Sequence, residues 1–169
     1  TGTLAKIYGI EYLVKGFIKA KVLNSELHIY GDGDFKNELI DLCQKNSNIK
    51  YFGTKPNEYI VKEQKKATLL INPRPSNEEF TKYSFPSKNL EYMASGTPLL
   101  ATDLPGIPDE YKKYEYIIEN ENVDGIANMF RYVLNLTDKE LRKKGKMAQK
   151  FVLNTKNNGE CFNIDFKDE

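Results

Sequence analysis

The sequence YSFPSKNLEYMASGTPLLAT, residues 83–102, decides the fold of this 169-residue chain. Leu90, Met93 and Ala94 recur at the i, i+3, i+4 spacing of a helix with one apolar stripe. Gly96 suits the left-handed residue at a helix end, and Pro98 prevents the helix from resuming. The apolar run LLAT then predicts a buried strand. The stretch therefore predicts a loop, a short helix and a strand in quick succession.

The start of this helix carries groups that could bind a ligand. Glu91 lies about one turn inside the helix, and Lys88 lies one turn before it. Ser84 and Ser87 can each cap the helix start, where backbone N–H groups have no intrahelical partner. A carboxylate, an ammonium group and N–H groups together suit a ligand with hydroxyls and phosphates, such as a nucleotide. A glutamate near a helix start is also favoured by the helix dipole alone, so a structural role for Glu91 stays open.

These residues resemble the donor-binding half of the GT-B glycosyltransferases, in the large retaining group often called family 4. That family has a Glu-x7-Glu motif, then a small-residue helix end, Gly-x-Pro and a hydrophobic strand. Glu91 stands at the second Glu, and Tyr83 stands at the first, which approaches the donor sugar in the family. The resemblance implies that Glu91 binds the ribose hydroxyls and that the loop from Ser84 through Phe85 to Ser87 meets the pyrophosphate.

Three further loops extend the resemblance. At the first strand, Gly2 allows a tight turn, Thr3 stands where the family has Arg, and Lys6 is the nearest basic substitute for its Lys. The glycines of the GDG turn lack the third glycine of a dinucleotide fingerprint, so a tight strand-to-helix turn that lines the crevice is their expected role. The resemblance places the next loop against the nucleotide base. The donor-binding residues that we expect are Glu91, Lys88, Ser87, Phe85, Ser84, Tyr83, Gly2, Thr3, Lys6, Gly31, Gly33, Gly53 and Thr54.

Strands and helices alternate along the chain, which predicts an α/β domain with a Rossmann-like parallel sheet of about six strands flanked by helices. We expect strands at 1–4, 27–30, 49–52, 68–72, 98–102 and 114–118, and helices that include 8–23, 35–45, 125–134 and 139–153. The helix over 57–66 carries alternating charge, which predicts a solvated face. Thr137 and Glu140 form a capping box. Residues 1–154 are one donor-binding domain, and 155–169 form a tail without periodicity that we expect to be disordered.

Bulk composition excludes several classes of protein. The 25 basic and 24 acidic residues give no electrostatic reason to bind nucleic acid. No apolar run approaches the ~20 residues of a membrane span. Cys43 and Cys161 fit neither a metal site nor a disulfide framework, so we expect no metal and a reducing, cytoplasmic location, with the inner face of the membrane as an alternative. His28 is expected in the core or at a strand edge.

The chain begins with TGTL, as if a strand were already in progress, and we interpret it as a piece of a longer protein whose N-terminal acceptor domain is absent. The resemblance implies that the whole enzyme transfers a sugar with retention, from a UDP- or GDP-linked donor to a sugar or lipid-linked acceptor, in polysaccharide or glycoconjugate biosynthesis. The nucleotide-sugar is a substrate, and no cofactor is expected. The piece alone should bind donor without turnover, and no catalytic residue is identified. Two alternatives stay open: a non-catalytic nucleotide-binding or assembly subunit, and a GT-B-type epimerase or phosphorylase.

Overall fold

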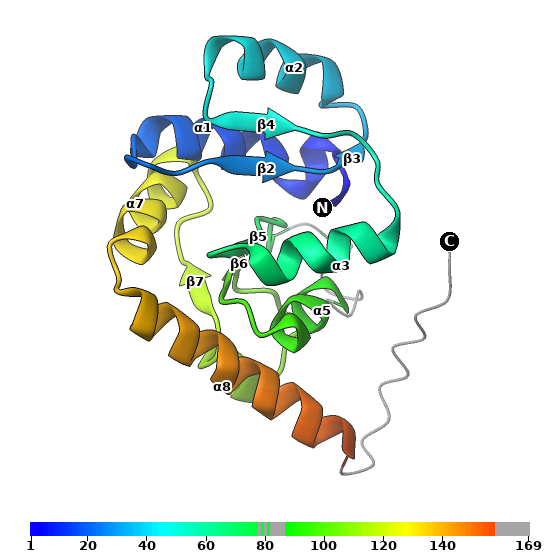
Figure 1. Ribbon diagram of the computed structural model, residues 1–169, viewed down its shortest axis with the longest axis vertical. Coiled ribbons are helices and arrows are strands. Elements are labelled where there is room, and N and C mark those ends of the chain that lie inside the picture. The colour runs from blue at the N-terminus through cyan, green and yellow to red at the C-terminus, as the bar shows by residue number, and fades with distance from the viewer. Residues whose placement is uncertain (78, 80, 82–86, 158–169) are drawn as a thin grey trace.

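The computed structural model describes residues 1–77, 79, 81 and 87–157 and has an α/β architecture (Figure 1). The strands are β1 Gly2–Thr3, β2 Leu27–Ile29, β3 Gly31–Asp32, β4 Ile49–Tyr51, β5 Leu70–Asn72, β6 Leu99–Thr102 and β7 Tyr116–Ile118. The helices are η1 Lys6–Tyr8, α1 Ile10–Ala20, α2 Lys36–Lys45, α3 Asn57–Lys66, α5 Ser87–Ser95, α6 Asp109–Lys112, α7 Val123–Leu134 and α8 Asp138–Asn157.

Every strand pair in the described residues is parallel, as expected for strands that alternate with helices. The strands form three hydrogen-bonded groups, ordered β1-β3, β2-β4 and β5-β6-β7. The expected single sheet of about six strands is therefore divided between β2 and β5. The additional strand β3 begins one residue after β2 ends, and it pairs with β1. A strand of two residues is too short to be predicted from an apolar pattern.

The core lies on both faces of the strands. On one face α1 packs against α7, where the rings of Phe17 and Phe130 meet edge to face with centroids 5.3 Å apart. Close packing of these helices depends on Gly16, because a Cβ there would lie 2.6 Å from Cγ2 of Ile126. A second cluster surrounds Met93 of α5 and is covered by α8, which crosses this side of the molecule (Figure 1). Both clusters are apolar interiors of the kind that stabilises an α/β domain.

The predicted elements are confirmed, with shifted ends. The stretch at 83–102 gives α5 and β6, and Gly96 has the predicted left-handed conformation with φ 81°. The helix expected at 8–23 is divided, because Gly9 adopts φ 77° after the turn η1, and it ends at Ala20 because Lys21 is left-handed. The capping box is confirmed by hydrogen bonds between Thr137 and Glu140. Helix α8 continues three residues past 154, and residues 158–169 lie outside the described residues.

Candidate functional site

The first turn of α5 holds the carboxylate and the ammonium group that the sequence singles out. Lys88 Nζ lies 3.1 Å from Glu91 Oε2, and the side chain of Glu91 is 24% exposed. Gln64 of α3 donates from Nε2 to the other carboxylate oxygen, Oε1, over 2.6 Å. Each carboxylate oxygen has two acceptor positions, so Glu91 keeps capacity for hydroxyl donors beside these two partners. The side chain is thus partly enclosed and oriented before any ligand binds.

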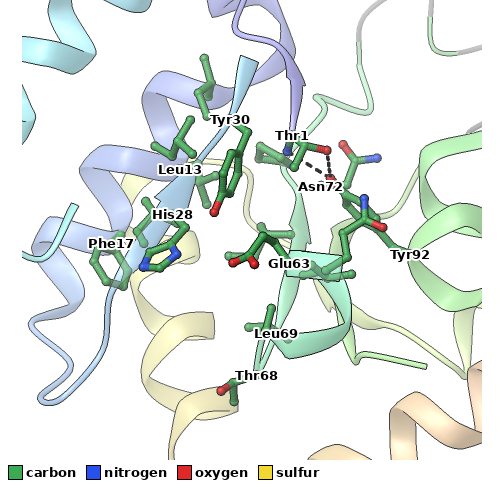
Figure 2. Close-up of a pocket in the computed structure, with 18 of the residues that line it drawn as sticks. Thr1, Leu13, Phe17, His28, Tyr30, Glu63, Thr68, Leu69, Asn72 and Tyr92 are labelled. Carbon is green, nitrogen blue, oxygen red and sulfur yellow. Dashed lines mark hydrogen bonds between the residues drawn. The ribbon is translucent and has the colours of Figure 1, made fainter. Parts of the chain in front are cut away.

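A cavity of about 730 Å³ lies beside this turn (Figure 2). Ser87 and Lys88 line it, whereas Glu91 itself is not among its lining residues. Gly2 and Thr3 of β1 line the same cavity, so the structure brings four of the expected donor-binding residues together. The α5 N–H groups of the first turn have no intrahelical acceptors. The sequence predicted that the carboxylate of Glu91, the ammonium group of Lys88 and backbone N–H groups share one small volume; Lys88 lines this cavity together with Gly2 and Thr3, whereas Glu91 lies outside its lining.

Tyr92 of α5 is hydrogen-bonded to Thr1, the residue just before β1. Its hydroxyl accepts a hydrogen bond from the nitrogen of Thr1 over 3.2 Å, and it lies 3.3 Å from Oγ1 of the same residue. Burial raises the pKa of Tyr92 to about 12, so the phenol stays neutral at physiological pH. Sequence reasoning missed this residue because an aromatic side chain beside an apolar stripe is usually only core.

The glycines of the GDG turn allow two backbone segments to lie close together. A Cβ on Gly31 would overlap the carbonyl oxygen of Gly2, and a Cβ on Gly33 would overlap the carbonyl group of Leu4. The turn leads from β3 into α2 as expected, but neither Gly31 nor Gly33 is among the residues that line the cavity. The space beside both glycines is occupied by β1, which gives a structural reason for glycine at both positions.

The other expected residues lie apart from the cavity. Gly53 adopts φ 67°, and its carbonyl accepts from the N–H of Gly31 over 3.0 Å. Thr54 follows it in the loop between β4 and α3. The ammonium group of Lys6 is paired with Glu38 on α2, and this bond raises its pKa. Lys6 is not among the residues that line the cavity, and this position weighs against it as a replacement for the family lysine.

Three expected residues, Tyr83, Ser84 and Phe85, lie outside the described residues. In contrast, Gln64 was missed although it is 3% exposed and touches Glu91. The solvated face expected for 57–66 belongs to a helix whose other side, with Ile60 and Gln64, is buried. Their spacing of four residues was the available signal, and the charges around them obscured it.

A buried polar chain runs behind the cavity and was also missed. Asn72, which lines the cavity, donates from Nδ2 to Oδ1 of Asn89 on α5. Asn89 Nδ2 in turn donates to Glu115 Oε2 over 3.2 Å. Glu115 is 4% exposed, and its other oxygen has no partner among the described residues. Burial raises the pKa of Glu115 to about 7.

Comparison with known families identifies the chain. A family model for glycosyl transferases, group 1, matches residues 1–151. The chain belongs to this family. A comparison with curated protein sequences finds no significant match.

Solved glycosyltransferases share the fold of this group 1 chain. The catalytic domain of cholesterol-α-glucosyltransferase from Helicobacter pylori matches with a TM-score of 0.71 and 18% identity, over 92% of this chain and 95% of that one. The C-terminal domain of LpcC, a group 1 protein of Francisella tularensis, gives 0.74 and 19%, over 93% and 83%. HepE from Anabaena, solved with UDP, gives 0.72 and 15%, over 90% of this chain and 43% of HepE. The expected fold, one half of a GT-B glycosyltransferase, is confirmed.

Within the part of the chain that the structure describes, no helix combines the length and the apolar composition that crossing a membrane requires.

Proposed function

We propose that this chain is the nucleotide-sugar donor-binding domain of a group 1 glycosyltransferase, and that Glu91 receives the ribose hydroxyls of the donor. One observation carries the proposal: the carboxylate of Glu91 is held by Gln64 and Lys88 at the first turn of a helix whose Ser87 and Lys88 line a cavity. A carboxylate held before binding loses little side-chain freedom when it accepts hydroxyl groups.

The proposed reaction depends on stabilisation of the negative charge on the leaving diphosphate. Sugar transfer leaves a nucleoside diphosphate, on which negative charge accumulates as the bond to the sugar breaks. In this proposal, the N–H groups of the first turn of α5 and the ammonium group of Lys88 stabilise that charge. Lys88 is 38% exposed, so it can turn from Glu91 to a phosphate at little cost. The reaction that we propose is transfer from a UDP- or GDP-linked donor with retention at the sugar and without a metal ion, in keeping with the family that the chain resembles.

The ligands of structurally similar glycosyltransferases support a uridine donor. HepE was solved with UDP and with UDP-glucose, and TarM of S. aureus was solved with UDP. We infer that the acceptor, a sugar or a lipid-linked sugar, binds to a second domain of the whole protein. Polysaccharide or glycoconjugate assembly in the cytoplasm or at the inner face of the membrane is the setting that fits such an acceptor. The domain alone then binds donor without turnover.

The test is calorimetric titration of this chain with UDP, GDP and UDP-glucose, together with thermal unfolding. A nucleotide that binds the folded state raises Tm, by mass action. Glu91→Gln keeps the shape of the side chain and removes its charge, and it should weaken binding at least tenfold. Glu110→Gln, on an exposed residue of α6, is the matched control and should leave binding unchanged. Absence of binding by every nucleotide at millimolar concentration would contradict the proposal.

A non-catalytic nucleotide-binding subunit is the second candidate. The pairing of Lys6 with Glu38, with Tyr83 and Thr3 at family positions for charged residues, favours it. The two candidates differ in turnover by the complete protein. Release of UDP from UDP-glucose in the presence of acceptor supports the enzyme, whereas binding without release supports the subunit.

A further inference from the structure

A chain of three polar side chains links the interior of the domain to the first turn of α5. Asn72, labelled in Figure 2, ends β5 and lines the cavity beside Ser87 and Lys88. Its Nδ2 donates to Oδ1 of Asn89, which is 1% exposed and lies in the first turn of α5. Asn89 Nδ2 in turn donates to Oε2 of Glu115 over 3.2 Å. The chain therefore runs from the proposed donor site to one buried carboxyl group.

Glu115 sets the direction of these hydrogen bonds. A carboxylate only accepts hydrogen bonds, whereas an asparagine amide accepts through its oxygen on one side and donates through its NH2 group on the other. Asn89 therefore turns its NH2 group toward Glu115 and its oxygen toward Asn72. Asn72 uses its own NH2 group on Asn89, which leaves its carbonyl oxygen for the opposite side. The carboxyl group thus determines which end of the Asn72 amide can face a ligand.

Glu115 is buried without full use of its hydrogen-bonding capacity. It is 4% exposed, and its Oε1 has no partner among the described residues. The nearby Lys112 of α6 is paired with Asp103 and Asp109, and Lys144 of α8 donates to a backbone carbonyl. A buried carboxyl group with an unused oxygen usually stabilises a fold less than an apolar side chain of the same size. Burial of this kind is typical of groups that serve a functional site.

Ionisation of Glu115 disturbs the chain of amides near neutral pH. Burial raises the pKa of Glu115 to about 7. Asp103, which follows β6, adds to the rise, and Lys112 of α6 and Lys144 of α8 oppose it. Below this pH the proton can reside on Oε1, which leaves Oε2 as an acceptor for Asn89. Above it, the buried negative charge favours movement of the carboxylate toward an ammonium group or water, and away from the amide.

We propose that Glu115 is a positioning residue for donor binding, because its acceptor oxygen fixes the amides of Asn89 and Asn72 and, with them, the first turn of α5 beside the end of β5. The inference rests on the proposed function of this turn. Glu115 acts only through Asn89 and does not line the cavity itself. Donor affinity is therefore full while Glu115 is protonated and falls when it ionises.

The test is calorimetric titration of this chain with UDP-glucose at pH 6 and pH 8. UDP-glucose lacks the terminal phosphate that would itself titrate near pH 6. The dissociation constant should rise about three- to tenfold from pH 6 to pH 8, tenfold being the limit for a ligand that binds only the protonated form. Glu115→Gln keeps an acceptor for Asn89 and cannot ionise, so it should match the parent at pH 6 and stay constant to pH 8. Glu110→Gln, exposed on α6, should keep the parent's dependence.

Glu115→Met separates positioning from stability. Methionine is of similar size, has no acceptor oxygen and suits a buried position, so at pH 8 the variant should unfold at the Tm of the parent or higher. Its affinity for UDP-glucose at pH 6 should nevertheless be about tenfold lower, because the amide of Asn89 is left without its acceptor. A residue with only a structural role would not lose affinity in a chain that keeps its stability.

NMR signals of the side-chain amides report on the chain without any ligand. The NH2 signals of Asn89 and Asn72 should shift between pH 6 and pH 8 in the parent and stay fixed in Glu115→Gln. Three results would overturn the inference: UDP-glucose binding that does not depend on pH, amide signals that do not follow the protonation of Glu115, and full affinity in Glu115→Met. Amide signals that shift in a chain without nucleotide binding at any pH place the failure in the proposed function, so the two failures are distinguishable.

Discussion

Gln64 Nε2 lies 2.6 Å from Glu91 Oε1, and this bond connects the last part of α3 to the carboxylate proposed to bind ribose. Gln64 is buried between α3 and α5, and its own carbonyl accepts from the hydroxyl of Thr97 over 2.8 Å. Helix α3 is therefore part of the site, because it sets the orientation of a group on α5.

Replacement of Gln64 by leucine tests this connection. The change keeps the volume and removes the donor to Glu91, so the free energy of unfolding should fall by about 1.5–3 kcal/mol, the usual range for a hydrogen bond to a charged group. Urea denaturation measures the loss. A double-mutant cycle with Glu91→Ala, which removes the acceptor, should give a coupling of at least about 0.5 kcal/mol, the lower limit for residues in contact. Additive effects would show that the bond does not form in solution.

Glu115 should make stability depend on pH. Burial raises its pKa to about 7 in the folded state, above the ordinary value of 4.5. The folded state then binds more protons than the unfolded state between these values, so the free energy of unfolding falls as pH rises from about 4.5 to about 7. Because a shift of one unit corresponds to about 1.4 kcal/mol, the fall is on the order of 3 kcal/mol. Denaturation at pH 5, 6, 7 and 8 measures it.

The control for this pH dependence is Glu115→Gln, which cannot ionise and keeps an acceptor for Asn89. The variant should lose most of the fall in stability between pH 5 and 7 and should be more stable than the parent chain at pH 8. Glu110→Gln, on the exposed side of α6, should keep the parent profile. An unchanged profile in the Glu115 variant would show that another group causes the dependence.

Helix α8 packs closely over the turn that ends α5. A Cβ on Gly145 would overlap the carbonyl oxygen of Gly96 and lie 2.9 Å from the nitrogen of Pro98. Gly145→Ala should therefore lower stability, because overpacking of about 1–3 kcal/mol exceeds the helix propensity of about 1 kcal/mol that alanine supplies. Thermal unfolding measures the change. Lys143→Ala, exposed on the same helix, should be close to neutral, and an alanine at 145 that raises Tm would contradict the packing.

Sequence patterns predicted the elements because apolar periodicity is local. The stripe of Leu90, Met93 and Ala94 and the Gly96 stop are both found in α5 and the turn after it. The division between β2 and β5 was not predictable, because pairing depends on contacts between segments far apart in the chain. The site was predicted in part for the same reason: Lys88 and Glu91 are neighbours on one helix.

The sequence did not reveal the hydrogen-bond and ion-pair partners that come from other helices and strands. The charges around Gln64 suggested a solvated face, yet that side chain points into the site. Glu115 lies just before β7, next to the aromatic and apolar residues of an expected strand, and nothing local indicates that Asn89 approaches it. Lys6 was expected near a phosphate, but the fold places Glu38 beside it. Local patterns therefore identify candidate groups, and only tertiary structure shows which of them are already paired.

Arg131 of α7 closes the end of α1. Its Nη2 donates to the carbonyl of Lys19 over 2.9 Å, and its Nε donates to the carbonyl of Ala20 over 3.2 Å. The last carbonyls of a helix have no intrahelical donor, so this side chain replaces a cap. Arg131→Met keeps the apolar stem and removes both donors. The free energy of unfolding should fall by about 1–2 kcal/mol, which is a decrease in Tm of several degrees in a domain of this size.

Arg131→Lys separates charge from geometry at the end of α1. A lysine keeps the favourable charge near the helix C-terminus but cannot donate to two carbonyls in the fixed arrangement of a guanidinium group, so stability should lie between the parent and the methionine variant. Arg142→Met, on an exposed position of α8, is the matched control and should change Tm little. Equal stability of the lysine and methionine variants would show that the charge contributes nothing, whereas full recovery by lysine would show that the paired donors are not needed.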